Sequence, residues 1–240
     1  MNSWFKYLFI GAILITGIAR SAPRPTVIEL FTSEGCSSCP PAEEFLAELA
    51  QRSDVLPLSF HVDYWNGLGW RDTFTFPAAT HRQQTYAASL HRNSVYTPQA
   101  VIDGDTDFVG SDRRSILASL GHSRDGVPTE IAITEGHLQI SIAAHAVAKT
   151  ADVLLISYLR EATAHIGRGE NAGRTLQEFN VVRSMQRLGG WDGVARTFST
   201  PLASLPPDAT HVALIVQAAD QGAILGAAAL PIRVFQQIGR

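Results

Sequence analysis

The two cysteines of this 240-residue chain stand three positions apart, in the sequence Cys36-Ser37-Ser38-Cys39. The segment before them, residues 26–31, is β-branched and apolar, which predicts a buried strand. The segment from residue 39 to residue 51 has apolar side chains at helical spacing. Its prolines lie in the first turn, where a helix tolerates them. The cysteine pair is therefore expected in a turn that joins a strand to a helix.

This position gives the two cysteines different expected roles. A cysteine reacts as its thiolate, and the N–H groups and dipole at a helix N-terminus stabilise a negative sulfur. We therefore expect Cys36 to be the nucleophile, with a pKa below that of a free thiol. Cys39 lies one turn further along the same side and is expected to resolve a mixed disulfide at Cys36. A purely structural bridge across so short a loop would remove little chain entropy.

The next segments predict the remainder of an α/β domain at residues 24–122. Further strands are expected at residues 55–62, 99–102 and 106–109, and helices at residues 77–90 and 116–120. The helices between these strands imply crossovers and therefore parallel pairing. The Asp103-Gly104 turn implies that the last pair is antiparallel. This mixed sheet flanked by helices is typical of a thioredoxin-like domain.

Three more residues are predicted to belong to the site. In a thioredoxin-like arrangement, a proline with a cis peptide bond begins the strand that faces the dithiol, which indicates Pro98 and the preceding Thr97. Asp63 ends the second predicted strand, where parallel sheets place their sites, and its carboxylate could assist proton transfer at the resolving cysteine. Glu34 is an alternative proton relay, although its charge would oppose a thiolate at Cys36.

The second half of the chain has a different pattern. Helical periodicity is scarce there, and apolar runs at residues 151–159 and 211–218 alternate with turn-rich stretches. This pattern favours an all-β, sandwich-like domain at residues 127–240. Residues 168–176 contain two glycines and three charges, which indicates a loop. It is interpreted either as an ordered β-sandwich loop or a contact with the first domain, or else as a recognition loop for an anionic or peptide partner.

The N-terminal segment is typical of a secretory signal peptide. Lys6 precedes an apolar run, and small residues flank a cleavage position after Ser21. The run is shorter than the roughly 20 residues that a membrane-spanning helix needs. Removal of residues 1–21 would leave no membrane span and a periplasmic or secreted protein. The net charge of −3 and the lack of a basic run predict no nucleic-acid partner.

Metal binding is the main alternative role for the cysteines. Zinc usually takes four ligands with a second close pair, and the histidines of this chain are too scattered to provide one. The histidines considered are His61, His81, His91 and His122. Cu(I) prefers soft thiolates, so Cys36, Cys39 and His61 could form a copper carrier site. A third interpretation is a non-enzymatic interaction protein whose disulfide is structural.

Five stretches of the sequence resemble a bacterial family of exported proteins of uncharacterised function. They are VIELFTSEGCSSCPPAE, FHVDYWNGLGW, YTPQAVIDG, GRGENAGRTL and NVVR. The resemblance implies a thioredoxin-like N-terminal domain followed by a β-rich domain, with Cys36 and Cys39 as the dithiol and Pro98 as the cis-proline. It implies no substrate. The preferred hypothesis is an exported thiol–disulfide oxidoreductase that acts on a protein or peptide partner and needs no bound cofactor.

Overall fold

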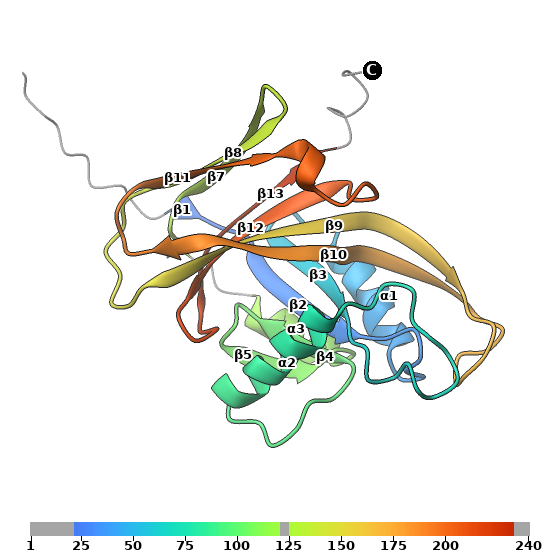
Figure 1. Cartoon of the computed structure of the whole chain (residues 1–240). Helices are drawn as coiled ribbons and strands as arrows, with labels where there is room; N and C mark the ends of the chain where they lie inside the picture. The colour runs from blue at the N-terminus through green and yellow to red at the C-terminus, as the bar shows by residue number, and fades with distance from the viewer. Residues whose placement is uncertain (1–21, 121–124, 233–240) are drawn as a thin grey trace, which may run out of the picture.

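The computed structural model describes residues 22–120 and 125–232, which form a mixed α/β protein (Figure 1). The predicted signal peptide lies outside the described residues. The strands are β1 (Ala22–Pro23), β2 (Thr26–Thr32), β3 (Val55–His61), β4 (Gln99–Ile102), β5 (Thr106–Val109), β6 (Asp125–Gly126), β7 (Thr129–Thr134), β8 (His137–Ile142), β9 (Ala151–His165), β10 (Thr175–Trp191), β11 (Arg196–Pro201), β12 (His211–Ala218) and β13 (Ile224–Pro231). The helices are α1 (Pro40–Leu49), α2 (Pro77–Ser89), α3 (Arg113–Ser119) and the short 3-10 helix η1 (Leu202–Ser204). No helix in the described ranges is long and apolar enough to cross a membrane.

Eight strands form one sheet in the order β13-β12-β9-β10-β3-β2-β4-β5. Strands β2 and β3 are parallel, whereas β4 pairs antiparallel with both β2 and β5. The predicted parallel pairing of β2 with β3 and the predicted antiparallel pairing of β4 with β5 are confirmed. Strand β4 follows α2 but pairs antiparallel with β2, so the parallel pairing implied by that helix is wrong. The second half contributes the remaining four strands, so both halves share a single continuous sheet.

Strand β2 lies at the centre of the first half because its side chains alternate between two apolar layers. Ile28 and Leu30 pack with residues of α1 and α3 on one face of the sheet. Val27 and Phe31 pack on the opposite face with α2 and with strands β9 and β12 of the second half. Burial on both faces explains why β2 is a continuous apolar run instead of alternating apolar and polar residues.

One polar residue of β2 is buried in the second layer with its own partners. Glu29 is fully buried and accepts two hydrogen bonds from Arg82 of α2, at 2.7 and 3.0 Å. Arg82 also donates to Gln217 of β12 at 2.9 Å, and Tyr86 donates to Glu29. The buried charges of Glu29 and Arg82 therefore both have hydrogen-bond partners, as buried charges require. It connects β2 and α2 of the first half to β12 of the second.

Strand β10 joins the two halves of the sheet. It pairs with β9 over almost its whole length but meets β3 in parallel at a single register position, Val181 opposite Ser59. Pro57 of β3 has no N–H group for a ladder. The side-chain amide of Asn180 instead donates to the carbonyl oxygen of Pro57 at 2.7 Å, and Asn180 itself has a φ of 48°. An irregular, side-chain-mediated contact therefore replaces regular pairing between β3 and β10.

A separate three-stranded sheet, in the order β11-β8-β7, covers one face of the second half. Leu138 and Ile140 of β8 pack with Val153 of β9 and Leu214 of β12 in a second apolar core. Strands β9 and β10 extend beyond this core as a long curved hairpin (Figure 1). The far end of that hairpin carries the loop that reaches the cysteines.

Candidate functional site

Cys36 and Cys39 form a disulfide, with 5.4 Å between their Cα atoms. The bond lies in the loop between the end of β2 and the start of α1, as the sequence predicted. Cys36 is 0% exposed and Cys39 is 1% exposed, whereas the intervening Ser37 and Ser38 are exposed. The hydroxyl oxygen of Ser38 lies 3.3 Å from the sulfur of Cys36. Two exposed serines thus separate the two buried cysteines, and one of these serines contacts a sulfur.

The amide groups at the start of α1 differ from the expectation. Pro40 and Pro41 occupy the first turn and have no N–H to offer. The next two amides, of Ala42 and Glu43, both donate to the carbonyl oxygen of Cys39, at 2.8 and 3.2 Å. These amides are therefore already paired within the helix start. The Ser38 hydroxyl, not a cluster of backbone N–H groups, is the donor that the structure places beside Cys36.

A loop from the β9–β10 hairpin covers the cysteine turn. The side-chain amide of Asn171 donates to the carbonyl oxygens of Glu34 and Cys36, at 2.9 and 3.0 Å. The carboxylate of Glu170 accepts a hydrogen bond of 3.2 Å from the backbone N–H of Ser37. Asn171 is itself buried. Of the two interpretations of this segment, contact with the first half of the chain is the one found.

Thr97 and Pro98 lie close to the cysteine turn, and the peptide bond between them is cis, as predicted. The indole N–H of Trp65 donates to the hydroxyl oxygen of Thr97 at 2.9 Å. Trp65 also packs against Gly35, where an added Cβ would meet the Cβ of Trp65 at 3.2 Å. Because Gly35 directly precedes Cys36, Trp65 bridges the cysteine turn and the Thr97-Pro98 segment.

The two carboxylates proposed from the sequence as proton relays serve other contacts. Asp63 accepts a hydrogen bond of 2.6 Å from the hydroxyl group of Thr80, in the first turn of α2. Glu34 accepts from the indole N–H of Trp70 at 2.5 Å and from the hydroxyl group of Thr73 at 2.6 Å. Both carboxylates therefore anchor the segment between β3 and α2.

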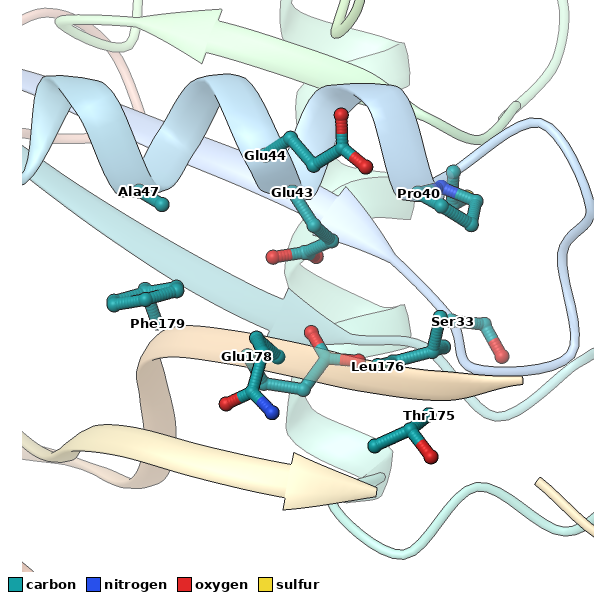
Figure 2. Close-up of a pocket in the computed structure, with 11 residues that line it drawn as sticks. Ser33, Pro40, Glu43, Glu44, Ala47, Thr175, Leu176, Glu178 and Phe179 are labelled. Carbon is teal, nitrogen blue, oxygen red and sulfur yellow. The ribbon is translucent and has the colours of Figure 1, made fainter. Parts of the chain in front are cut away.

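A cavity of about 280 Å³ opens beside Cys39, between α1 and β10 (Figure 2). It is lined by Ser33, Cys39, Pro40, Glu43, Glu44, Ala47, Thr175, Leu176, Gln177, Glu178 and Phe179. Glu43 extends from α1 toward β10, and Glu178 lies opposite it on β10, whereas the carboxylate of Glu44 is turned away (Figure 2). The carboxyl groups of Glu43 and Glu178, which face each other across this cavity, were not indicated by the sequence.

His61, at the end of β3, lies with these two carboxyl groups. Its Nδ1 is 2.9 Å from Oδ2 of Asp72, and its Nε2 is 3.8 Å from Oε2 of Glu178. One donor atom each from Glu43, His61 and Glu178 lie within 4.8 Å of one another, and all three residues are buried. The copper site suggested by the sequence paired His61 with the cysteines, whereas the structure places it among carboxylates.

Burial and charge shift the pKa values in this cluster in opposite directions. Burial would lower the pKa of His61, but the charge and hydrogen bond of Asp72, with the charges of Glu178 and Glu43, raise it to about 10. Burial raises the pKa of Glu178 well above its ordinary value and also raises that of Glu43. Burial opposes ionisation of Asp72 as well, but the adjacent His61 lowers its pKa. One imidazole therefore faces three carboxyl groups, of which Asp72 is the best stabilised as an anion.

Comparison with known proteins identifies a family and similar folds. A family model described as "Protein of unknown function (DUF1223)" matches residues 27–217. The crystal structure of a protein from Agrobacterium tumefaciens has 35% sequence identity and a TM-score of 0.77, and the match covers 88% of this chain and 95% of that one. The structure of HBP35 of Porphyromonas gingivalis has 14% identity and a TM-score of 0.61, with 88% and 76% covered, which indicates a similar fold alone. No curated protein matches this chain.

Proposed function

The chain belongs to the DUF1223 family of unknown function, and we propose that it is a thiol–disulfide oxidoreductase built on a thioredoxin-like N-terminal half. The observation that carries the proposal is the Cys36–Cys39 disulfide in the loop between β2 and α1. Two cysteines bonded across two residues at a helix start can alternate between dithiol and disulfide with little backbone movement. The expected signal peptide agrees with this chemistry, because disulfides persist in oxidising compartments outside the cytosol.

The arrangement of the surrounding strands supports the same proposal. Strands β3, β2, β4 and β5 are adjacent in that order, with β2 and β3 parallel and β4 antiparallel to its neighbours. This is the mixed sheet that we expect of a thioredoxin-like domain. Trp65 holds Thr97 beside the cysteine turn, so the start of β4 is within reach of a segment bound there.

The proposed reaction conserves atoms and electrons without a bound cofactor. In the dithiol form, the Cys36 thiolate attacks one sulfur of a disulfide in a protein or peptide partner. A Cys36–partner bond forms, and the second sulfur of the partner leaves as a thiolate. Cys39, as its thiolate, then attacks the Cys36 sulfur, and the Cys36–partner bond breaks. The partner sulfur leaves as a thiolate, the Cys36–Cys39 disulfide is regenerated, and two electrons have passed to the partner. The sequence of steps is reversible, and reduction of the protein by a partner dithiol follows the same path.

The Ser38 hydroxyl is the group proposed to stabilise the attacking sulfur. It lies 3.3 Å from the Cys36 sulfur in the disulfide form. After reduction, its O–H can donate to the Cys36 thiolate, and hydrogen bonds to charged acceptors are stronger than neutral ones. The exposed position of Ser38 lets its side chain follow the sulfur as the disulfide opens.

Exchange with a partner requires the covering loop to move, because neither cysteine is exposed. Glu170 and Asn171 hold the loop on the cysteine turn through bonds to the Ser37 N–H and to the Cys36 carbonyl oxygen. The hydrogen bond from Ser37 to Glu170 is at an exposed position and is therefore weak. Release of these contacts is the step that we propose exposes the sulfur atoms.

The same burial favours a second candidate function, a protein whose disulfide is a permanent structural bridge. A buried disulfide is protected from thiolate attack, and structural disulfides have reduction potentials below about −300 mV. Equilibration of the protein in thiol–disulfide buffers of graded potential, followed by alkylation and mass measurement, separates the two functions. The oxidoreductase requires a reversible midpoint above about −300 mV. A midpoint below that value supports the structural bridge and overturns the proposal.

A further inference from the structure

Three buried polar atoms beside the disulfide have no hydrogen-bond partner in the described structure. They are Oε2 of Glu43, Nε2 of His61 and Oε2 of Glu178. Folded proteins pair nearly all of their buried polar atoms, because an unpaired one destabilises the fold. A single ion bound by all three atoms would give each of them a partner. The chemistry of the atoms, two carboxylate oxygens and one imidazole nitrogen, is that of a cation site.

We propose that Glu43, His61 and Glu178 bind a divalent transition-metal ion, with Zn²⁺ as the best match. Zinc accepts histidine nitrogen and carboxylate oxygen together, and its reactive sites often have three protein ligands and one open position. Mg²⁺ and Ca²⁺ prefer oxygen ligands alone, and Cu(I) prefers sulfur. This site contains neither cysteine, so it is available in the disulfide form and does not depend on the proposed redox function.

The spacing of the donor atoms suits such an ion after a small closure. Nε2 of His61 is 3.8 Å from Oε2 of Glu178, and the three donor atoms lie within 4.8 Å of one another. A tetrahedral zinc ion about 2.0–2.2 Å from each ligand places the ligand atoms about 3.3–3.6 Å apart. Rotation of the Glu43 side chain, which lines the cavity, can supply the remaining movement.

Neighbouring groups orient two of the three ligands toward the common point. Asp72 bonds to Nδ1 of His61 at 2.9 Å, so Nε2 is the ring nitrogen available to the metal, which would displace its proton on binding. A carboxylate in this position is the usual outer partner of a metal-bound histidine. Asp72 is itself held, because it accepts from the backbone N–H groups of Glu34 and Phe74, each at 2.8 Å.

Glu43 is oriented in the same way, and the fold brings the third ligand to it. The hydroxyl group of Ser59 donates to Oε1 of Glu43 at 3.1 Å, so Oε2 remains for the metal. The ligands come from α1, β3 and β10. The pairing of β3 with β10 brings His61 and Glu178 to the same part of the sheet. The cavity lined by Glu43 and Glu178 gives an entry path and room for a water molecule or small anion at the open position (Figure 2).

Titration with Zn²⁺ tests this site directly. Protein without a histidine tag is purified in the disulfide form, stripped with a chelator and titrated with Zn²⁺ in a calorimeter. We expect one ion per chain, with binding at least tenfold weaker in Glu43→Gln and in Glu178→Gln. Glu44→Gln is the matched control, because Glu44 lines the same cavity with its carboxylate turned away (Figure 2). It should bind Zn²⁺ as the wild type does.

Two further measurements keep the test decisive if a variant fails to fold. In the wild type, the ring nitrogen NMR signals of His61 should shift with one equivalent of Zn²⁺ and not with Mg²⁺. The double variant Cys36→Ser/Cys39→Ser should retain Zn²⁺ binding. The proposal is overturned if the wild type takes up no stoichiometric Zn²⁺, which would leave a cluster that only shares protons. It is equally overturned if uptake needs the cysteines, or if Glu43→Gln and Glu178→Gln bind as tightly as the wild type.

Discussion

Asn171 donates a hydrogen bond of 3.0 Å to the carbonyl oxygen of Cys36, although 135 positions separate the two residues in the chain. A second bond from the same amide group reaches the carbonyl oxygen of Glu34. The β-rich half of the protein thus contributes directly to the environment of the disulfide. Under the proposed function, these contacts would let the second half control access to the cysteines.

Replacement of Asn171 by alanine should accelerate reduction of the disulfide. Two buried hydrogen bonds are lost, each of which contributes about 1 kcal/mol, so the open state of the loop should become roughly thirtyfold more populated. The rate of reduction by a protein dithiol, followed by alkylation of the released thiols, measures the change. Ala172→Ser, at an exposed position in the same loop, is the control and should leave the rate unchanged. Equal rates in all three proteins would show that the loop does not limit access.

Replacement of Ser38 by alanine should make the Cys36 thiolate less stable. Loss of a hydrogen bond to a charged sulfur, worth about 1.5 kcal/mol, moves the midpoint of thiol ionisation up by about one pH unit. Iodoacetamide alkylation rates against pH, measured in a Cys39→Ser background, report this midpoint. Ser37→Ala is the matched control. A midpoint that is the same in both serine variants and in the parent would exclude the proposed role of Ser38.

Asp63 is expected to affect stability and not exchange. Its carboxylate accepts from the Thr80 hydroxyl at the start of α2, so Asp63→Asn should lower the free energy of unfolding by about 1 kcal/mol. The rate of thiol–disulfide exchange should stay within twofold of the wild type. Urea unfolding and exchange with a disulfide-containing peptide measure the two quantities. A large loss of exchange rate with unchanged stability would restore the catalytic role predicted from the sequence.

Asp107 should make the fold sensitive to acid. Burial alone would raise the pKa of Asp107, but hydrogen bonds from Gln99, Tyr96 and Arg92 outweigh it and lower that pKa. A lowered pKa means that the ionised group stabilises the fold above its ordinary pKa, and this contribution is lost as the pH falls through the lowered value. Asp107→Asn should therefore destabilise the protein by about 1–2 kcal/mol at pH 7 and by less at about pH 3.5. Urea unfolding at both pH values checks this, and a constant difference would contradict it.

The sequence predicted strands well where the local pattern is strong. The bounds expected for β4, β5 and β12 agree with the structure, because each is a short run between clear turn signals. Strand β10 was not predicted. Polar residues and Gly189-Gly190 interrupt its pattern, and its pairing with β3 depends on the Asn180 side chain. Most of its pairing is with β9, and the interrupted pattern of β10 gives no local signal of that hairpin.

In the candidate site too, the sequence predicted the residues that belong to local motifs and missed those that tertiary packing brings together. The cysteine pair and the cis Thr97-Pro98 bond follow from local motifs. Glu43 had a detectable signal, because it is a carboxylate on the apolar face of α1 next to Phe45 and Leu46. Glu178 had none, since its position depends on how β10 packs beside β3.

The exchange reaction is examined most directly with a Cys39→Ser variant, which can attack a partner but cannot resolve the product. The variant is produced with its N-terminal segment, and adducts are identified by mass spectrometry before and after reduction. Cys36→Ser is the matched control. We predict mixed disulfides through Cys36 that disappear on reduction and are absent from the control. No adducts in Cys39→Ser, or equal adducts in both variants, would contradict the assignment of Cys36 as the nucleophile of a thiol–disulfide oxidoreductase.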